Sequence, residues 1–201
     1  SEVSGLYNFE LAQLYYRQGK KYNKETNPET QWKLKTALEL CTAISANFPN
    51  SHASEKAEIL KNQILKPELQ ITAEQFLPIQ KQSFVLLRYT NIQSLDFKIF
   101  KISKSQLEAF HKTHRKEEQY QFISNLNASE TWNINLPTEN DFQNHSTEAV
   151  LPALENGHYI LFAQQPNSGE TFGFTTIQVS DMALLSKSTN TSETFQIINR
   201  N

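Results

Sequence analysis

His111 and His114 are the two side chains whose spacing points most directly to chemistry. They lie three positions apart in a stretch of helix-forming residues, and on a helix this spacing places two imidazoles on one face, where they can share a metal ion. The neighbouring cations Lys112, Arg115 and Lys116 would repel such an ion, and the sequence offers no evident third ligand. A solvated helix face is the simpler interpretation, so we predict no metal site here.

Cys41 is the single cysteine, which excludes a disulfide within the chain. It falls on the apolar face of an expected helix, and no adjacent cation is present to lower its pKa. We therefore interpret Cys41 as a small buried residue and not as a nucleophile.

Other catalytic and cofactor patterns are missing from the sequence. The five glycines are scattered, so there is no phosphate-binding loop, and no Gly-x-Ser-x-Gly elbow occurs. The carboxylate pair Glu117 and Glu118 lies on a polar stretch, while His145 and His158 are lone histidines beside turns, a setting typical of surface or internally satisfied histidines. We predict no catalytic residue, no cofactor and no enzyme activity.

Composition sets outer limits on function. The chain has 201 residues, 38% of them hydrophobic and 20% charged, which indicates a folded globular chain with room for one domain and a smaller one. The net charge of -2 and the lack of a basic block argue against a nucleic-acid partner, and no apolar run approaches the roughly 20 residues that cross a bilayer. The start, SEVSGLYNFE, does not resemble a signal peptide. Either the protein is cytoplasmic, or this is a mature or trimmed form.

The first third of the sequence is helical in pattern. Apolar residues at helical spacing predict a first helix that ends at Gly19. Asn27-Pro28-Glu29 predicts a cap and first turn for a second helix that includes Trp32, and Ser51 predicts the cap of a third that ends before Pro67. We expect residues 1–66 to form a helical cap packed on another part of the protein, or the end of a longer helical segment.

After Pro67 the pattern alternates as in β-strands. The runs 84–89 and 95–102 predict an antiparallel pair at the centre of a sandwich, the first an inner strand that is apolar on both faces and the second half-buried through Leu95, Phe97 and Ile99. One amphipathic helix is expected over 107–123, and a turn over 76–78. Five more strands are expected at 69–72, 131–136, 147–151, 158–163 and 172–179. Seven strands suit an immunoglobulin- or fibronectin-like sandwich, so the predicted fold class is α+β.

The expected domain division follows from these patterns. Residues 1–66 form the helical cap and 67–181 the sandwich. Residues 182–201 hold one more hairpin, around Ser188-Thr189-Asn190, and the start of a following β-domain that is truncated here.

Several stretches together resemble a known family. The string ALELCTAISANFPNSHASEKA resembles a tetratricopeptide-type hairpin, and a helical hairpin ending in FPNS before a proline-led change to strands resembles the N-terminal part of bacterial alpha-2-macroglobulin-like proteins, particularly the large Bacteroidetes type. Residues 67–71 resemble a first macroglobulin strand, and 85–91 with 95–100 its central hairpin. Residues 151–160 resemble the proline-glycine-x-tyrosine entry to a late strand, and 179–182 the passage into the next macroglobulin-like domain.

The resemblance implies a mechanism that needs more than this chain. Family members consist of several sandwich domains, a bait region cut by proteases and a Cys-Gly-Glu-Gln thioester, and some bacterial relatives lack the thioester. Cys41 is followed by Thr42-Ala43-Ile44, so that motif is absent here, and no bait region is recognisable. The implied role is a non-catalytic N-terminal scaffold of a protease inhibitor. Its partners would be other domains of the same long chain and, through the whole protein, target proteases. The implied location is the periplasm or cell envelope, by secretion or as a lipoprotein.

A second interpretation stays open, that of a surface sandwich module that binds glycan or peptide through aromatics such as Trp132 or Tyr159. A sugar platform needs exposed, coplanar rings, whereas the period-two positions of these two residues favour burial.

Overall fold

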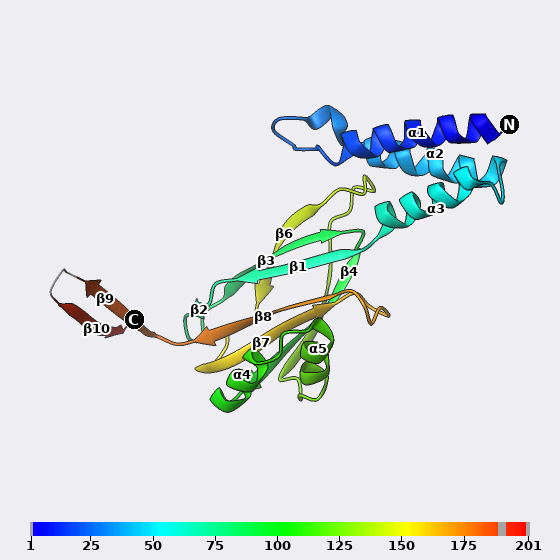
Figure 1. Cartoon of the computed structure of the whole chain (residues 1–201). Coiled ribbons are helices and arrows are strands. Elements are labelled where there is room, and N and C mark those ends of the chain that lie inside the picture. The colour runs from blue at the N-terminus through cyan, green and yellow to red at the C-terminus, as the bar shows by residue number, and fades with distance from the viewer. Residues whose placement is uncertain (1, 189–191, 200–201) are drawn as a thin grey trace. The chain divides into compact units, whose positions relative to one another are not determined.

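The computed structural model describes residues 2–188 and 192–199 (Figure 1). It combines helices with two main β-sheets and a hairpin, which confirms the α+β class. The chain forms two compact units, each made of three segments, so the backbone passes between them five times. The first unit holds Ser1–Leu69, Arg88–Gln93 and Leu136–Ser146, and the second holds Gln70–Leu87, Ser94–Asn135 and Thr147–Asn201.

The first unit is built on three α-helices and a short 3-10 turn. They are α1 (Glu2–Gly19), the 3-10 turn η1 (Pro28–Thr30), α2 (Lys33–Asn47) and α3 (His52–Leu65). Ser51 caps α3 by accepting a hydrogen bond from the Ser54 backbone N–H at 3.2 Å, as predicted. The expected start of the second helix is wrong. Pro28 opens only η1, because the Asn27 amide makes no cap bond and donates to the Lys21 carbonyl instead. Helix α2 begins after Trp32, whose side chain is 47% exposed.

Small side chains let the three helices approach closely. Ala12, Ala37, Ala53 and Ala57 are fully buried, and larger apolar residues fill the core around them. These larger residues are Phe9, Leu34, Cys41, Ile44, Leu60 and Ile64. Gly19 is also buried, and a Cβ built on it would lie 2.7 Å from the Leu34 Cγ and 2.8 Å from the Leu34 backbone nitrogen. The end of α1 therefore requires glycine because the start of α2 passes beside it.

The second unit contains most of the strand residues. In chain order the strands are β1 (Glu68–Ala73), β2 (Phe76–Leu77), β3 (Ser83–Thr90), β4 (Ser94–Ile102), β5 (Glu130–Asn135), β6 (His145–Leu151), β7 (Gly157–Gln164) and β8 (Phe172–Val179). One end of each of β1, β3 and β6 belongs to the first unit. One sheet has the order β1-β3-β6 and the other the order β2-β8-β7-β4-β5. In the larger sheet β4 pairs antiparallel with β5 and β7, and β7 with β8, while β2 lies parallel to β8.

Three predictions about these strands are wrong. β3 and β4 do not pair, because they belong to different sheets. The break between them buries Ile92 and turns at Asn91 with a φ of 56°, so the chain changes sheet instead of closing a hairpin. β3 is the middle strand of its sheet, but only one face is buried, and Phe84 on the other is 53% exposed. Phe76 and Leu77 form the short strand β2 and not a turn, which gives eight strands before residue 182 where seven were expected.

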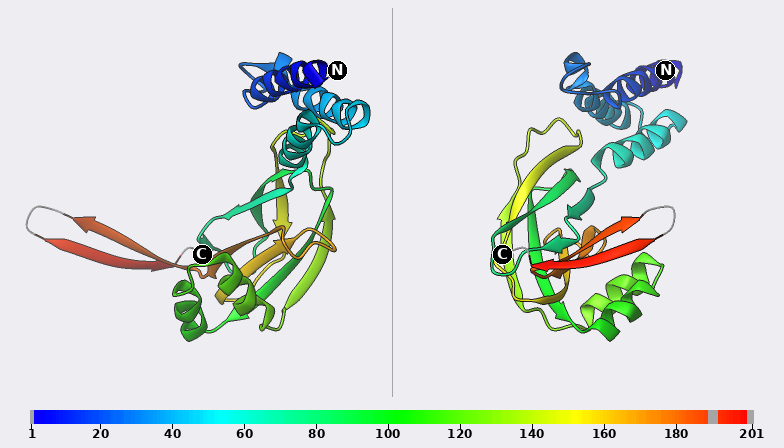
Figure 2. Two further views of the ribbon diagram at one scale, coloured as in Figure 1. Left: turned by 45° about the vertical axis from the view of Figure 1, so that its right-hand side comes forward. Right: turned by 90° about the vertical axis from the view of Figure 1, so that its left-hand side faces the viewer.

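Two helices cover one face of the larger sheet, where a single helix was expected. They are α4 (Lys104–His111) and α5 (Lys116–Ser124), and both lie against this sheet (Figure 2). Ser103 and Gln106 form a capping box at the start of α4. The helical pattern breaks after His111, where Thr113 donates its hydroxyl hydrogen to the Phe110 carbonyl. Phe110 and Ile123 from the two helices pack with apolar residues of β4, β7 and β8. This packing buries both faces of β4 and not one, since Phe100 and Ile102 face the helices.

The end of the described chain is the predicted hairpin. β9 (Met182–Ser188) pairs antiparallel with β10 (Glu193–Asn199). Thr189 and Asn190 of the expected turn lie outside the described residues. The domain boundaries expected after residues 66 and 181, and the truncated following domain, stay predictions.

The close approach at Gly19 gives a stability test. Gly19→Ala forces the new methyl group against the backbone of α2, and overpacking of this kind costs about 1–3 kcal/mol. We expect a lower unfolding midpoint in urea, followed by circular dichroism. Gly169→Ala is the matched control, because a Cβ there meets nothing within 4 Å. An unchanged midpoint for Gly19→Ala would contradict the packing described for this helix junction.

Candidate functional site

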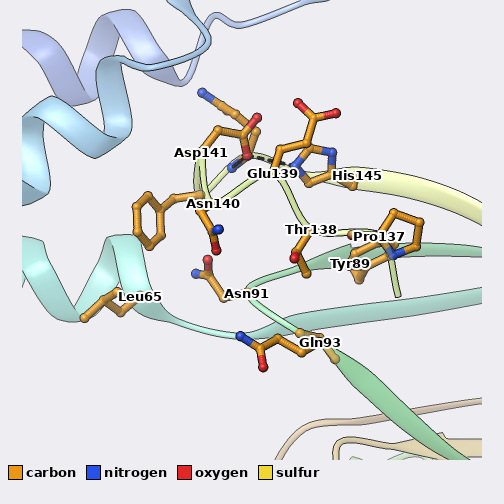
Figure 3. Close-up of a pocket in the computed structure, with 13 residues that line it drawn as sticks. Leu65, Tyr89, Asn91, Gln93, Pro137, Thr138, Glu139, Asn140, Asp141 and His145 are labelled. Carbon is orange, nitrogen blue, oxygen red and sulfur yellow. Dashed lines mark hydrogen bonds and ion pairs between the residues drawn. The ribbon is translucent and has the colours of Figure 1, made fainter. Parts of the chain in front are cut away.

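A polar cavity of about 270 Å³ lies within the first unit, where the loop 136–146 and the segment 88–93 meet the end of α3 (Figure 3). Its lining mixes apolar side chains with amides, two hydroxyls, two carboxylates and a histidine. The lining residues are Leu65, Tyr89, Asn91, Ile92, Gln93, Pro137, Thr138, Glu139, Asn140, Asp141, Phe142, Gln143 and His145. We call it the loop cavity.

Asp141 is the most constrained charged residue of this site. Its side chain is only 1% exposed. Oδ1 accepts a hydrogen bond from the Gln143 backbone N–H at 3.0 Å and lies 2.8 Å from the His145 Nε2, while Oδ2 accepts from the Gln31 Nε2 at 3.0 Å. Burial raises the pKa of the Asp141 carboxyl, but the hydrogen bonds from Gln143, Gln31 and His145 outweigh it and hold this pKa below its ordinary value. Asp141 therefore remains a carboxylate at neutral pH.

Gln143 fastens the same loop to the helices. Its buried side-chain amide donates to the Gly19 carbonyl at 3.2 Å and to the Gln31 carbonyl at 2.9 Å. These two carbonyls lie at the two ends of the connection between α1 and α2. The ring of Phe142, one residue earlier, packs against the helical core. We call the contacts of Asp141, Phe142 and Gln143 with the helical segment the loop anchor.

Asn91 makes a second attachment. Its side-chain amide donates to the Ile64 carbonyl at 2.7 Å and to the Lys66 carbonyl at 3.2 Å, which satisfies backbone acceptors at the end of α3. Asn91 and Asn140 have φ values of 56° and 54°, a conformation that asparagine adopts at low cost. Phe142 has a φ of 62°, which is unfavourable for a bulky residue and persists because its surroundings hold it.

Asp141 and His145 form a carboxylate–histidine pair of the kind found in catalytic triads. The groups around this pair indicate a structural role instead. A triad also needs a nucleophile beside the histidine. Among the described residues that line the loop cavity, none is a serine or cysteine, the Tyr89 hydroxyl donates to the Pro137 carbonyl at 2.6 Å, and the Thr138 hydroxyl makes no hydrogen bond with His145. Both oxygens of Asp141 already serve the loop anchor. The polar side chains of Asp141, Gln143 and His145 therefore hold the loop in place.

His111 and His114, interpreted from the sequence as part of a solvated helix face, do not lie on one helix in the structure. His111 ends α4 and His114 lies in the connection to α5, and both are exposed. No group of three histidine, cysteine or acidic side chains suited to a metal occurs in residues 2–188 and 192–199.

The other singled-out residues differ in burial, with Cys41 and Tyr159 buried and Glu117 and Glu118 exposed. Cys41 is inert, because burial, with a smaller contribution from Glu58, raises the pKa of its thiol to about 11. His145 is paired with Asp141, whereas the Nδ1 of His158 is buried and has no hydrogen-bond partner in the described chain. Tyr159 is buried, and Trp132 is partly buried and stacks on Phe97 at 5.0 Å between ring centroids.

Comparison with known proteins gives similarity to solved structures alone. No family model matches the chain, and no curated protein matches it. Native alpha-2-macroglobulin from Escherichia coli, in a structure spanning domains MG0-NIE-MG1, is 17% identical, with a TM-score of 0.43 over 62% of this chain and 42% of that one. The CARDB domain of a Pyrococcus furiosus protein is 9% identical, with a TM-score of 0.31 over 57% of this chain and 88% of that one. Red sea bream transglutaminase is 10% identical, with a TM-score of 0.33 over 70% of this chain and 21% of that one. This chain thus spans less than half of the E. coli structure.

Among the described helices, none combines the length and apolar character needed to cross a membrane.

Sequence reasoning missed the loop anchor. Asn140-Asp141 stood out only as a polar turn, and Gln143 and Gln31 carried no signal. The Asp141–Gln31 hydrogen bond joins residues 110 positions apart, and no periodicity in the sequence reports such a contact. The one available signal was the pair of turn-forming asparagines at positions 140 and 144, on either side of a phenylalanine that is partly buried in the structure.

The pKa of Asp141 predicts a pH dependence of stability. Because the pKa is depressed in the folded state, the stabilisation is present above the unfolded value of about 4 and is lost as the pH falls through the folded value. Asp141→Asn should therefore destabilise the protein most near pH 7, and its deficit relative to the wild type should shrink below about pH 4. Urea unfolding from pH 7 to pH 2.5 measures this. Glu148→Gln, at an exposed carboxylate of β6, is the control and should show no such trend. A deficit that is independent of pH would contradict the charged network.

Proposed function

We propose that this chain is a non-catalytic scaffold: an N-terminal part of an alpha-2-macroglobulin-like protease inhibitor, with protease trapping carried out by the whole protein. The observation that carries the scaffold role is the loop anchor. The buried Asp141 carboxylate and the buried Gln143 side-chain amide form hydrogen bonds within the chain. These bonds hold the loop 136–146 against the connection between α1 and α2. A site built for chemistry would keep such groups available to a substrate.

Residue-level resemblance supports the family assignment within this proposal. β1 begins at Glu68, directly after Pro67, where the resemblance sets the first macroglobulin strand. The Phe48-Pro49-Asn50-Ser51 turn joins α2 and α3 as a helical hairpin, in which Ser51 also donates to the Phe48 carbonyl at 2.7 Å. The residues likened to a central hairpin depart from the pattern, since β3 and β4 lie in different sheets.

The interleaving of the two units also supports a scaffold. An independently moving domain is usually joined to its neighbour by one linker. Here the backbone passes between the two units five times. Under this proposal the partners are further domains of the same long chain and, through the whole protein, target proteases. The location would be the periplasm or cell envelope of a bacterium, with secretion or lipid anchoring of the whole protein.

The glycan- or peptide-platform interpretation through Trp132 and Tyr159 is not favoured by any observation. Tyr159 is 3% exposed, and one face of the Trp132 ring stacks on Phe97. These two rings do not form an exposed coplanar surface.

The test uses the natural protein that contains this chain, mixed with a broad-specificity protease and separated on a denaturing gel. We expect a high-mass protease adduct that methylamine pretreatment abolishes, since methylamine opens a thioester. A protease whose catalytic serine has been blocked is the control and should give no adduct. If the trap lacks a thioester, the enclosed protease should still cleave small substrates while bulky ones are protected. Simple degradation, with neither adduct nor protection, would refute the inhibitor function.

A further inference from the structure

A second cavity, of about 360 Å³, lies within the second unit and is lined by α5, the segment that follows it and strands β4, β5 and β7 of the larger sheet. Figure 2 shows α5 against this sheet. The floor of the cavity is apolar, because Phe100, Phe162 and Ile123 are buried and pack together. Tyr120 adds a third ring, whose centroid lies 6.1 Å from that of Phe162. We call this space the α5 cavity.

Strand register places Lys98 and Thr131 side by side at this cavity. Lys98 lies two residues before Phe100, so both side chains project from the same face of β4. In the antiparallel ladders Lys98 is directly opposite Phe162 of β7 on one side and Thr131 of β5 on the other. Directly opposite residues have Cβ atoms about 4.5–5.5 Å apart on one face of a sheet. The Lys98 and Thr131 side chains therefore leave the sheet together, beside the buried rings, and all four residues line the α5 cavity.

Lys98 sets the sign of the ligand. Of the eleven described residues that line the α5 cavity, it alone carries a charge. It is partly buried, and it makes no hydrogen bond or ion pair through its side chain within the described part of the chain. Asp96, two residues earlier on the same face, does not line the cavity, and its Oδ1 accepts a hydrogen bond from the Asn133 side-chain amide at 2.8 Å. An anion is thus attracted here, and a cation is disfavoured.

The size and walls of the α5 cavity narrow the ligand further. A volume of about 360 Å³ lies near the lower end of the range of about 300–1,000 Å³ typical of small-molecule sites. Such sites combine apolar walls with a few polar groups that fix the orientation of the ligand, as the rings and the Lys98–Thr131 pair do here. A small inorganic anion would leave the apolar walls without a partner. A carboxylate attached to an apolar body uses both the walls and the cation.

We infer that the α5 cavity binds a small molecule that joins an apolar body to a carboxylate. The carboxylate pairs with the Lys98 ammonium and accepts a hydrogen bond from the Thr131 hydroxyl. The apolar body packs against the rings of Phe100, Tyr120 and Phe162. This inference goes beyond the scaffold function and does not depend on it, because the α5 cavity shares no residue with the loop anchor.

The test is a titration of the ¹⁵N-labelled chain with 4-phenylbutyrate, followed by nuclear magnetic resonance. We expect saturable shifts concentrated in residues 98–100, 120–131 and 162–164. The neutral 4-phenylbutyramide has a similar shape without the charge, and it should bind about tenfold more weakly, the effect of losing one charge-assisted hydrogen bond. Acetate keeps the charge without the apolar body. It should bind more weakly still, because each buried methylene group strengthens binding by about fourfold.

Substitutions locate the binding in the α5 cavity. Lys98→Gln should weaken the binding of 4-phenylbutyrate by about tenfold and leave that of the amide unchanged. Lys81→Gln is the matched control, at an exposed lysine that does not line the cavity, and it should change neither. Thr131→Val, at an exposed strand position, serves as a second variant if Lys98→Gln alters the spectrum of the free protein. It should weaken the binding of 4-phenylbutyrate by about fivefold, the effect of losing one hydrogen bond.

Four outcomes would overturn the inference: no saturable shifts, equal binding of 4-phenylbutyrate and its amide, acetate binding as tight as that of 4-phenylbutyrate, or unchanged binding of 4-phenylbutyrate in Lys98→Gln. The readout is binding by this chain alone. Its failure is therefore separate from failure of the inhibitor function, which is measured on the whole protein with a protease.

Discussion

The side-chain amide of Gln143 donates both its hydrogens to backbone carbonyls of the helical segment, one at Gly19 and one at Gln31. This pair of bonds fixes where the loop 136–146 attaches. A buried amide left without partners costs about 1–3 kcal/mol, so positions of the loop in which these bonds are broken are disfavoured by that amount. Apolar packing alone does not select one position so sharply, since hydrophobic contacts are not directional.

Several unusual features of the first unit follow from this attachment. Asp141 can stay charged while buried because three donors surround it, and one of them, Gln31, belongs to the connection that Gln143 holds. Phe142 keeps a left-handed backbone because its ring packs in the helical core between these two anchored neighbours.

Local signals in the sequence predicted the elements well and their partners poorly. The serine cap of α3 and the glycine at the end of α1 act over a few residues, and each was predicted correctly. The alternation in β4 correctly gave Leu95, Phe97 and Ile99 as buried, but it did not report that Phe100 and Ile102 on the other face are buried too. The pairing of β3 with β4 was wrong because alternation reports which face is buried and not which strand lies alongside. Burial of Ile92 and the turn at Asn91 decide that question, and both depend on tertiary contacts.

The split of α4 from α5 was missed because the polar stretch 112–115 contains residues that helices tolerate. The loop anchor could not be predicted from local patterns, because its hydrogen bonds join residues more than 100 positions apart in the sequence.

The central claim is that Gln143 joins the loop 136–146 and the connection between α1 and α2 into one cooperative structure, and amide hydrogen exchange tests it most directly. Exchange would be measured by mass spectrometry for the wild type, for Gln143→Ala and for Gln82→Ala, a control at an exposed glutamine. The account predicts that residues 137–145 and 19–31 are protected together in the wild type and in Gln82→Ala, and that both segments lose protection together in Gln143→Ala. Unchanged protection in Gln143→Ala, or loss in only one of the two segments, would contradict it.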